Sequence, residues 1–150
     1  MKRLTILINP ASGPDRPVLS LLNTAFQHSG LEWEIAITKR AGDAQRLARA
    51  AAQAGADVVG VYGGDGTVME AASGLIGTPT PLAIFPGGTA NVIAIELGIP
   101  ADPAEACKLV TGQAPSLLRA VDMIQVGQQY FALRVGTGLE AQMVEGAPAQ

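Results

Sequence analysis

Cysteine, aromatic residues and charge are scarce in this sequence. A single cysteine, Cys107, among 150 residues excludes an intramolecular disulfide and a metal site built from several cysteines. Aromatic residues make up only 4% of the chain and charged residues 15%. The ten Lys and Arg residues are scattered and the formal net charge is −3, so we expect no nucleic-acid-binding surface.

Long apolar runs are also missing. No window approaches the roughly 18 consecutive apolar residues that a membrane-spanning helix needs. Met1-Lys2-Arg3 leads directly into a short strand-like run, without the apolar stretch of a secretory signal. We therefore expect a cytoplasmic protein, for which any membrane contact would be peripheral and at the inner face.

What the chain does contain is an alternation of short apolar runs with segments of helical spacing. Hydrophobic residues make up 48% of the sequence, and Gly and Pro number 18 and 10, which fits an α/β protein with close strand–helix packing. The predicted strands are 4–8, 33–37, 57–62 and 81–85. The predicted helices are 17–27, a helix that Asp43 caps and that runs to 54, then 67–75, 91–97 and 103–110. This order predicts a doubly wound, mostly parallel sheet.

The unusual chemistry of the sequence follows the predicted strands. In a parallel sheet all carboxyl ends of the strands meet at one edge, where ligands bind. The loops at that edge would be 9–13, 38–43, 63–67 and 86–89. Their coincidence at one predicted edge is stronger evidence for a binding site than any single loop.

The central loop is Gly63-Gly64-Asp65-Gly66-Thr67. A glycine turn between a strand and a helix exposes backbone N–H groups at a partially positive helix end, which suits a phosphate. A carboxylate there needs a metal or a transferred proton to be tolerated, so Asp65 suggests phosphate chemistry. The loop lacks the Lys-Ser/Thr pair of a P-loop. It also fails the dinucleotide-binding pattern, because Met69 stands where a third glycine is required.

Other polar residues of these loops allow two interpretations each. Thr67 and Glu70 have the spacing of a capping box, so Glu70 is either structural or orients a ligand hydroxyl. The turn containing Gly87, Gly88 and Thr89 either binds phosphate or ribose or is a plain turn capped by Thr89. In the first loop, Asn9 and Ser12 either bind phosphate or stabilise their own turn.

The pattern changes beyond residue 116. Two β-like runs, 117–126 and 129–135, flank Gly127-Gln128 and predict a hairpin. We assign 1–116 to the α/β domain and 117–150 to the beginning of a truncated β-rich domain; the alternative is an edge hairpin that completes a single domain. Unprotected hairpin edges could pair between two copies, so a homodimer is a further expectation.

Together these loops resemble the diacylglycerol kinase catalytic-domain family, which includes bacterial lipid kinases and sphingosine kinases. The motifs that carry the resemblance are NPASG at 9–13, Thr38 with AGDA at 41–44, GGDGT at 63–67 with Glu70, and PGGTAN at 86–91. Their order and spacing match over residues 4–97. The segment 133–141 looks like the first turn of that family's second domain.

The resemblance implies ATP-dependent phosphorylation of a lipid hydroxyl, with Mg²⁺ as cofactor and this chain as the ATP-binding half. Asp65 would belong to the catalytic centre, while Gly138 and Glu140 would approach the acceptor lipid. The residues that would line the ATP site are Asn9, Pro10, Ala11, Ser12, Gly13, Thr38, Gly63, Gly64, Asp65, Gly66, Thr67, Glu70, Gly87, Gly88 and Thr89. The family's Mg²⁺ ligands and general base lie beyond residue 150, so we assign no metal ligand here and expect the chain alone to be inactive.

The sequence departs from the family pattern at three positions. Met69 replaces a common Asn, Val92 replaces a common Asp, and Glu140 replaces a common Asp on the acceptor side. Two alternatives stay open. An NAD kinase shares the central loop, although the motifs at 9–13 and 86–91 argue against it. A stand-alone nucleotide-binding or regulatory module is the other.

Overall fold

The computed structural model describes residues 2–14, 16–116 and 118–132, and the chain divides into two units, Met1–Arg119 and Ala120–Gln150. Within these described ranges, no helix is both long enough and apolar enough to cross a bilayer. The candidate loops that the structure describes all belong to the first unit.

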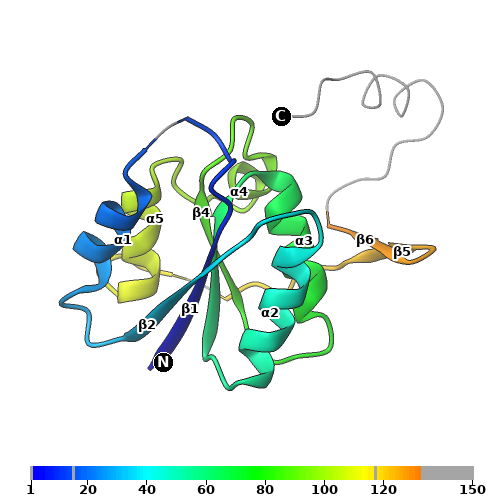
Figure 1. The fold of residues 1–150 in the computed structure, drawn as a ribbon, viewed down its shortest axis with the longest axis horizontal. Coiled ribbons are helices and arrows are strands. Elements are labelled where there is room, and N and C mark those ends of the chain that lie inside the picture. The colour runs from blue at the N-terminus through cyan, green and yellow to red at the C-terminus, as the bar shows by residue number, and fades with distance from the viewer. Residues whose placement is uncertain (1, 15, 117, 133–150) are drawn as a thin grey trace. The chain divides into compact units, whose positions relative to one another are not determined.

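The first unit is built on a four-stranded sheet. The strands are β1 (Arg3–Ile8), β2 (Glu32–Ile37), β3 (Val58–Gly63) and β4 (Leu82–Pro86). They lie in the order β2-β1-β3-β4, and every neighbouring pair is parallel (Figure 1). The apolar central strands β1 and β3 are almost entirely buried, as expected for strands covered on both faces.

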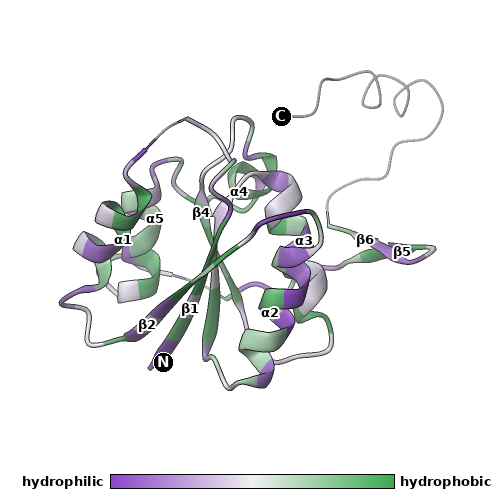
Figure 2. Cartoon of the chain, in the orientation of Figure 1, coloured by the Kyte–Doolittle hydropathy of each residue, from purple (hydrophilic) through white to green (hydrophobic). Residues whose placement is uncertain are grey.

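Helices cover both faces of this sheet (Figure 1). They are α1 (Val18–Phe26), α2 (Asp43–Gln53), α3 (Asp65–Leu75), α4 (Val92–Glu96) and α5 (Pro103–Thr111). Helices α1 and α5 pack with one face of the strands around Phe26 and Phe85, and α2, α3 and α4 pack with the other around Val59 and Val61. Figure 2 shows the hydrophobic colouring along the strands and hydrophilic bands on the helices. The predicted doubly wound α/β fold is therefore confirmed.

Two predicted helix starts are wrong. Helix α2 begins at Asp43 itself, and its N-cap is Gly42 in the left-handed conformation (φ 84°). Helix α3 begins at Asp65 after an extended Gly64, so Thr67 is not its N-cap and forms no capping box with Glu70. In both places a glycine precedes the helix, but only Gly42 has a backbone conformation that favours glycine, because Gly64 is extended.

The second unit contains a short hairpin. Strands β5 (Ile124–Val126) and β6 (Gln129–Phe131) pair antiparallel across a turn in which Gly127 has φ 61°. Both strands are shorter than the predicted runs. The predicted acceptor-side residues Gly138 and Glu140 lie outside the described residues, and the β-rich second domain stays a prediction.

Candidate functional site

The first and third strands form the switch point of the sheet. β1 and β3 are neighbours, and the helices that follow them, α1 and α3, lie on opposite faces (Figure 1). In open α/β sheets ligands bind at the carboxyl edge beside such a switch point. The backbone N–H of Asn9 donates to the carbonyl of Tyr62 at 3.0 Å and thereby extends the pairing up to the two loops.

The loop after β3 presents the amino end of α3. The Val68 N–H donates to the carbonyl of Gly64 at 3.0 Å, which leaves the N–H groups of residues 65–67 directed out of the helix end. Gly66 is exposed, its φ is not left-handed, and a Cβ added there would have no heavy atom within 4 Å. Neither backbone conformation nor protein packing therefore requires glycine at this position, which points to close approach of a ligand.

The loop after β1 lies against this helix end. The Asn9 side-chain amide donates to the Thr67 hydroxyl at 2.9 Å, and its oxygen accepts from the N–H of Ala11 at 3.0 Å. The Ser12 hydroxyl accepts from the N–H of Gly64 at 3.3 Å. Asn9 and Ser12 therefore stabilise their own turn and also join it to the glycine loop. Pro10, Ala11 and Gly13 are exposed beside these contacts.

The loop after β4 is packed directly on the loop after β3. The Gly87 N–H donates to the carbonyl of Gly63 at 3.0 Å. A Cβ at Gly88 would lie 2.5 Å from the Cα of Gly64, and a Cβ at Gly13 would collide with the carbonyl oxygen of Gly87. Glycines are thus needed where three backbones meet. The predicted convergence of the loops at 9–13, 63–67 and 86–89 is confirmed as geometry, with Thr89 exposed at the rim.

Asp65 has protein partners that its place in the sequence did not indicate. Its two carboxylate oxygens accept from the N–H groups of Val92 at 3.1 Å and Ile93 at 2.9 Å, the first two residues of α4. The N-cap of α4, Asn91, makes no side-chain capping bond to that helix. Asp65 therefore supplies the cap from another element. The expectation that only a metal or a proton could accommodate this carboxylate was incomplete, since backbone N–H groups also stabilise it.

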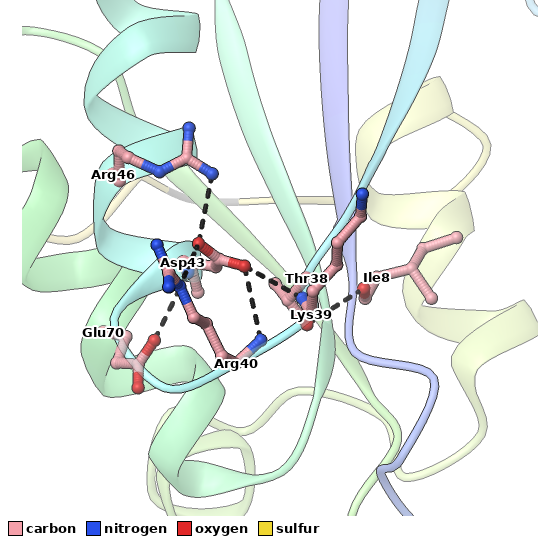
Figure 3. Close-up of polar contacts among 8 residues, drawn as sticks. Ile8, Thr38, Lys39, Arg40, Asp43, Arg46 and Glu70 are labelled. Carbon is pink, nitrogen blue, oxygen red and sulfur yellow. Dashed lines mark hydrogen bonds and ion pairs between the residues drawn. The ribbon is translucent and has the colours of Figure 1, made fainter.

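The loop after β2 is organised by a buried carboxylate, as Figure 3 shows. Asp43 is only 6% exposed and accepts from the N–H groups of Lys39 at 2.9 Å and Arg40 at 3.3 Å. The guanidinium of Arg46 donates to the same carboxylate at 3.1 Å. These bonds, first the N–H of Lys39 and then Arg46, hold the pKa of Asp43 below its ordinary value. These contacts fix the conformation of the short turn before α2 in the structure.

Thr38 is placed differently from the residues of the glycine loops. It is buried, and both its N–H and its hydroxyl donate to the carbonyl of Ile8, at 2.9 and 3.3 Å (Figure 3). The hydroxyl proton is therefore used inside the protein, although its oxygen can still accept a bond. The structure joins Thr38 to the end of β1.

Glu70 connects this turn to α3. Its carboxylate accepts from the N–H of Ala44, in the first turn of α2, at 3.3 Å (Figure 3). Glu70 therefore makes a structural contact, but a different one from the predicted capping box, and its role in orienting a ligand hydroxyl stays a prediction. Helix α3 thus carries two carboxylates, Asp65 and Glu70, that cap two neighbouring helices.

Sequence reasoning missed one residue of this site. Asn91 is the only non-glycine residue with positive φ among those described, at φ 49°. Its side chain closes a ring on Gly88: the oxygen accepts from the Gly88 N–H at 2.9 Å, and the amide donates to the Gly88 carbonyl at 2.8 Å. Asn tolerates the left-handed conformation better than most residues, but its position alone does not reveal the contact.

The comparisons with known proteins agree with this geometry. Residues 3–126 match the sequence model of the diacylglycerol kinase catalytic domain. Similar curated proteins include a diacylglycerol kinase from Bacillus subtilis (strain 168), 34% identical over 100% of this chain and 50% of the relative. Another is named "Probable lipid kinase YegS-like", from Pseudomonas putida, and is 42% identical over 75% of this chain and 37% of the relative.

Solved structures give the same family. The crystal structure of a diacylglycerol kinase from Bacillus anthracis str. Sterne is similar with a TM-score of 0.70 and 33% identity, covering 87% of this chain and 48% of that one. This chain thus spans about half the length of the two Bacillus kinases. On the fold, the loops and these matches together, the chain belongs to the diacylglycerol kinase catalytic-domain family.

Proposed function

We propose that this chain is the ATP-binding half of an ATP-dependent lipid kinase that transfers phosphate to a lipid hydroxyl. The observation that carries the proposal is the junction of the two glycine turns: Gly87 donates to Gly63, and Gly88 contacts Gly64. This junction places two β–α turns side by side at the carboxyl edge of the sheet. Phosphoryl transfer depends mainly on positioning and charge stabilisation, which such turns provide.

The N–H groups at the start of α3 are the main phosphate donors in this proposal. Three N–H groups, those of residues 65–67, leave the helix end without an intrahelical acceptor, and the helix dipole adds partial positive charge. Gly66 gives a phosphate room to approach the backbone, since a Cβ there would project into open space. The exposed Thr89 can add a hydroxyl donor from the neighbouring turn.

The residues present fit a magnesium ion that is bound chiefly through the phosphates of the nucleotide. Within the described ranges, no group of three or more His, Cys, Asp or Glu residues could hold a metal ion, so an all-protein cage is not formed there. Mg²⁺ commonly uses only one or two carboxylates together with substrate phosphates, and the Asp65 carboxylate would lie near such an ion without being assigned as its ligand. The ion would offset the charge of the phosphates during transfer.

Asp65 has two functions in this proposal. As the partner of the Val92 and Ile93 N–H groups it fixes α4 against α3, and as a carboxylate at the phosphate turn it belongs to the reacting centre. Both functions need an oxygen acceptor, but only the second needs a full negative charge. The substitution Asp65→Asn separates them in part, because the amide oxygen can still accept one of the two hydrogen bonds, whereas the amide NH2 group cannot accept the other.

A phosphoryl-transfer assay tests the proposed function. The protein encoded by the complete reading frame is incubated with Mg²⁺ and radiolabelled ATP, in parallel with diacylglycerol vesicles and with NAD. We expect label in the lipid. Transfer to NAD alone would favour the NAD kinase alternative, and transfer to neither would contradict the proposal.

Calorimetry addresses the remaining alternative, a stand-alone nucleotide-binding or regulatory module. Here the chain of 150 residues is titrated with ATP and Mg²⁺. Weak binding by this chain, with tighter binding by the protein from the complete reading frame, supports half of a cleft. Equally tight binding by both supports the module.

Sedimentation with vesicles of the acceptor lipid tests the proposed peripheral membrane contact in the same preparations.

A further inference from the structure

We propose that Asn91 is a positioning residue that holds the Gly87–Gly88 turn in its ligand-binding conformation against the Gly63–Gly64 turn. The inference rests on the proposed function, because it assigns the turn to a nucleotide phosphate. Asn91 would not touch the reacting atoms; it would act through the backbone of Gly88.

The first argument is the pair of hydrogen bonds between Asn91 and Gly88, which we call the brace. The Asn91 side chain makes two hydrogen bonds to one residue, accepting from the Gly88 N–H at 2.9 Å and donating to its carbonyl at 2.8 Å. The N–H and the carbonyl of Gly88 belong to the two peptide units that flank its Cα, so a side-chain amide that bonds to both fixes the positions of these two units relative to each other. The side chain therefore determines how the turn is oriented.

The second argument is the backbone conformation of Asn91. A φ of 49° is unfavourable for a residue with a Cβ, and such conformations persist only where the surroundings impose them. No capping bond to α4 explains it, since Asp65 caps that helix through Val92 and Ile93. The left-handed turn at Asn91 is instead what directs its side chain back to Gly88.

The third argument is what the braced residue touches. A Cβ on Gly88 would lie 2.5 Å from the Cα of Gly64, so the two backbones are already in contact. The N–H of Gly64 is in turn held by the Ser12 hydroxyl at 3.3 Å. Displacement of Gly88 would therefore displace the loop at the start of α3, which carries the proposed phosphate donors. One side chain positions two turns.

The test compares Asn91→Gly with Asn91→Asp in the protein from the complete reading frame. Glycine keeps the left-handed backbone and removes both hydrogen bonds, so the fold is retained while the brace is lost. Aspartate keeps the acceptor for the Gly88 N–H and loses the donor. The control is Asn23→Ala, at an exposed position of α1 remote from the sheet edge.

We expect Asn91→Gly to raise the KM for ATP about tenfold, as the loss of two hydrogen bonds of ordinary strength predicts. We expect kcat to change by less than about twofold, because the residue does not act on the transition state itself. Exchange of the Gly88 amide hydrogen, followed by NMR, should become faster in Asn91→Gly and stay slow in Asn91→Asp. The control should resemble the wild type in all three measurements.

An unchanged KM for ATP, or unchanged exchange of the Gly88 amide, in Asn91→Gly would overturn the inference. A loss of kcat with unchanged KM would also overturn it, because that pattern marks a residue of the chemical step. If the wild type binds no ATP, the proposed function fails, and the exchange of the Gly88 amide alone then decides whether Asn91 braces the turn.

Discussion

Gly66 offers a direct test of whether a ligand determines the sequence of the α3 amino end. It is exposed near the start of a helix, has no left-handed φ, and would have no neighbour within 4 Å of an added Cβ. Glycine costs a helix roughly 0.5–1 kcal/mol relative to alanine. We therefore expect Gly66→Ala to stabilise the protein by about that amount, which raises the melting temperature by roughly 2 °C.

The same substitution should impair nucleotide binding. A methyl group at Gly66 would occupy the space that a phosphate needs in order to reach the N–H groups at the helix end. Overpacking of a tight contact costs about 1–3 kcal/mol. This corresponds to a KM for ATP that is roughly 5- to 140-fold higher. Stability and affinity should therefore change in opposite directions.

Gly74→Ala is the matched control, because it makes the same change in the same helix. A Cβ there would collide with the carbonyl oxygen of Gln45 and lie 3.0 Å from the Cβ of Ala48, both in α2. This glycine is required by helix packing, so the protein should lose about 1–3 kcal/mol of stability. Its KM for ATP should stay close to that of the wild type.

The two variants are compared by thermal unfolding and by steady-state kinetics with varied ATP. The reasoning is refuted if Gly66→Ala binds ATP as the wild type does. It is also refuted if Gly66→Ala lowers the melting temperature, because the space around its Cβ would then be smaller than the structure indicates.

Three further predictions concern single side chains. Asp65→Asn should abolish phosphoryl transfer and lower the melting temperature less than Asp65→Ala, which removes both acceptors of the α4 cap and should lose about 1 kcal/mol; retained turnover in either variant would remove Asp65 from the reacting centre. Burial raises the pKa of the Cys107 thiol to about 12, so it should not react with Ellman's reagent at pH 8 before unfolding. Because the unfolded thiol ionises near 9.0, stability should fall as the pH rises above that value, and Cys107→Ser should lack this dependence. The bonds that lower the pKa of Asp43 stabilise the fold above pH 3.8, and this stabilisation is lost as the pH falls through the pKa of the folded state. Asp43→Asn should therefore be less stable than the wild type at pH 7, and the difference should shrink in acid. A constant difference across this range would contradict the assignment.

The parallel sheet and the loops at its carboxyl edge could be predicted because they follow from local patterns, whereas the order of the strands was not predicted. Apolar runs, glycine turns and helical spacing identify elements one at a time, and the rules of parallel sheets then place their ends together. The starts of α2 and α3 were missed for a local reason as well. Residues with capping side chains, Asp43 and Thr67, were preferred over the glycines that precede these helices.

The contacts of Asp65, Glu70 and Asn91 could not be predicted from the sequence. Asp65 bonds to residues 27 and 28 positions away, and Glu70 to one 26 positions away, so no local spacing indicates the pairs. The ring between Asn91 and Gly88 is local, but it depends on a left-handed backbone that the packing of two glycine turns imposes. Such contacts are decided by tertiary structure.

The two carboxylates of α3 have a consequence for how the sequence can diverge. Their partners are the main-chain N–H groups of Ala44, Val92 and Ile93, not side chains. Any residue except proline supplies that donor. The exposed side chain of Val92 is therefore free to change without loosening its junction, whereas the buried side chains of Ala44 and Ile93 are restricted by the core around them. Substitutions should therefore be tolerated at position 92 and restricted at Asp65 and Glu70.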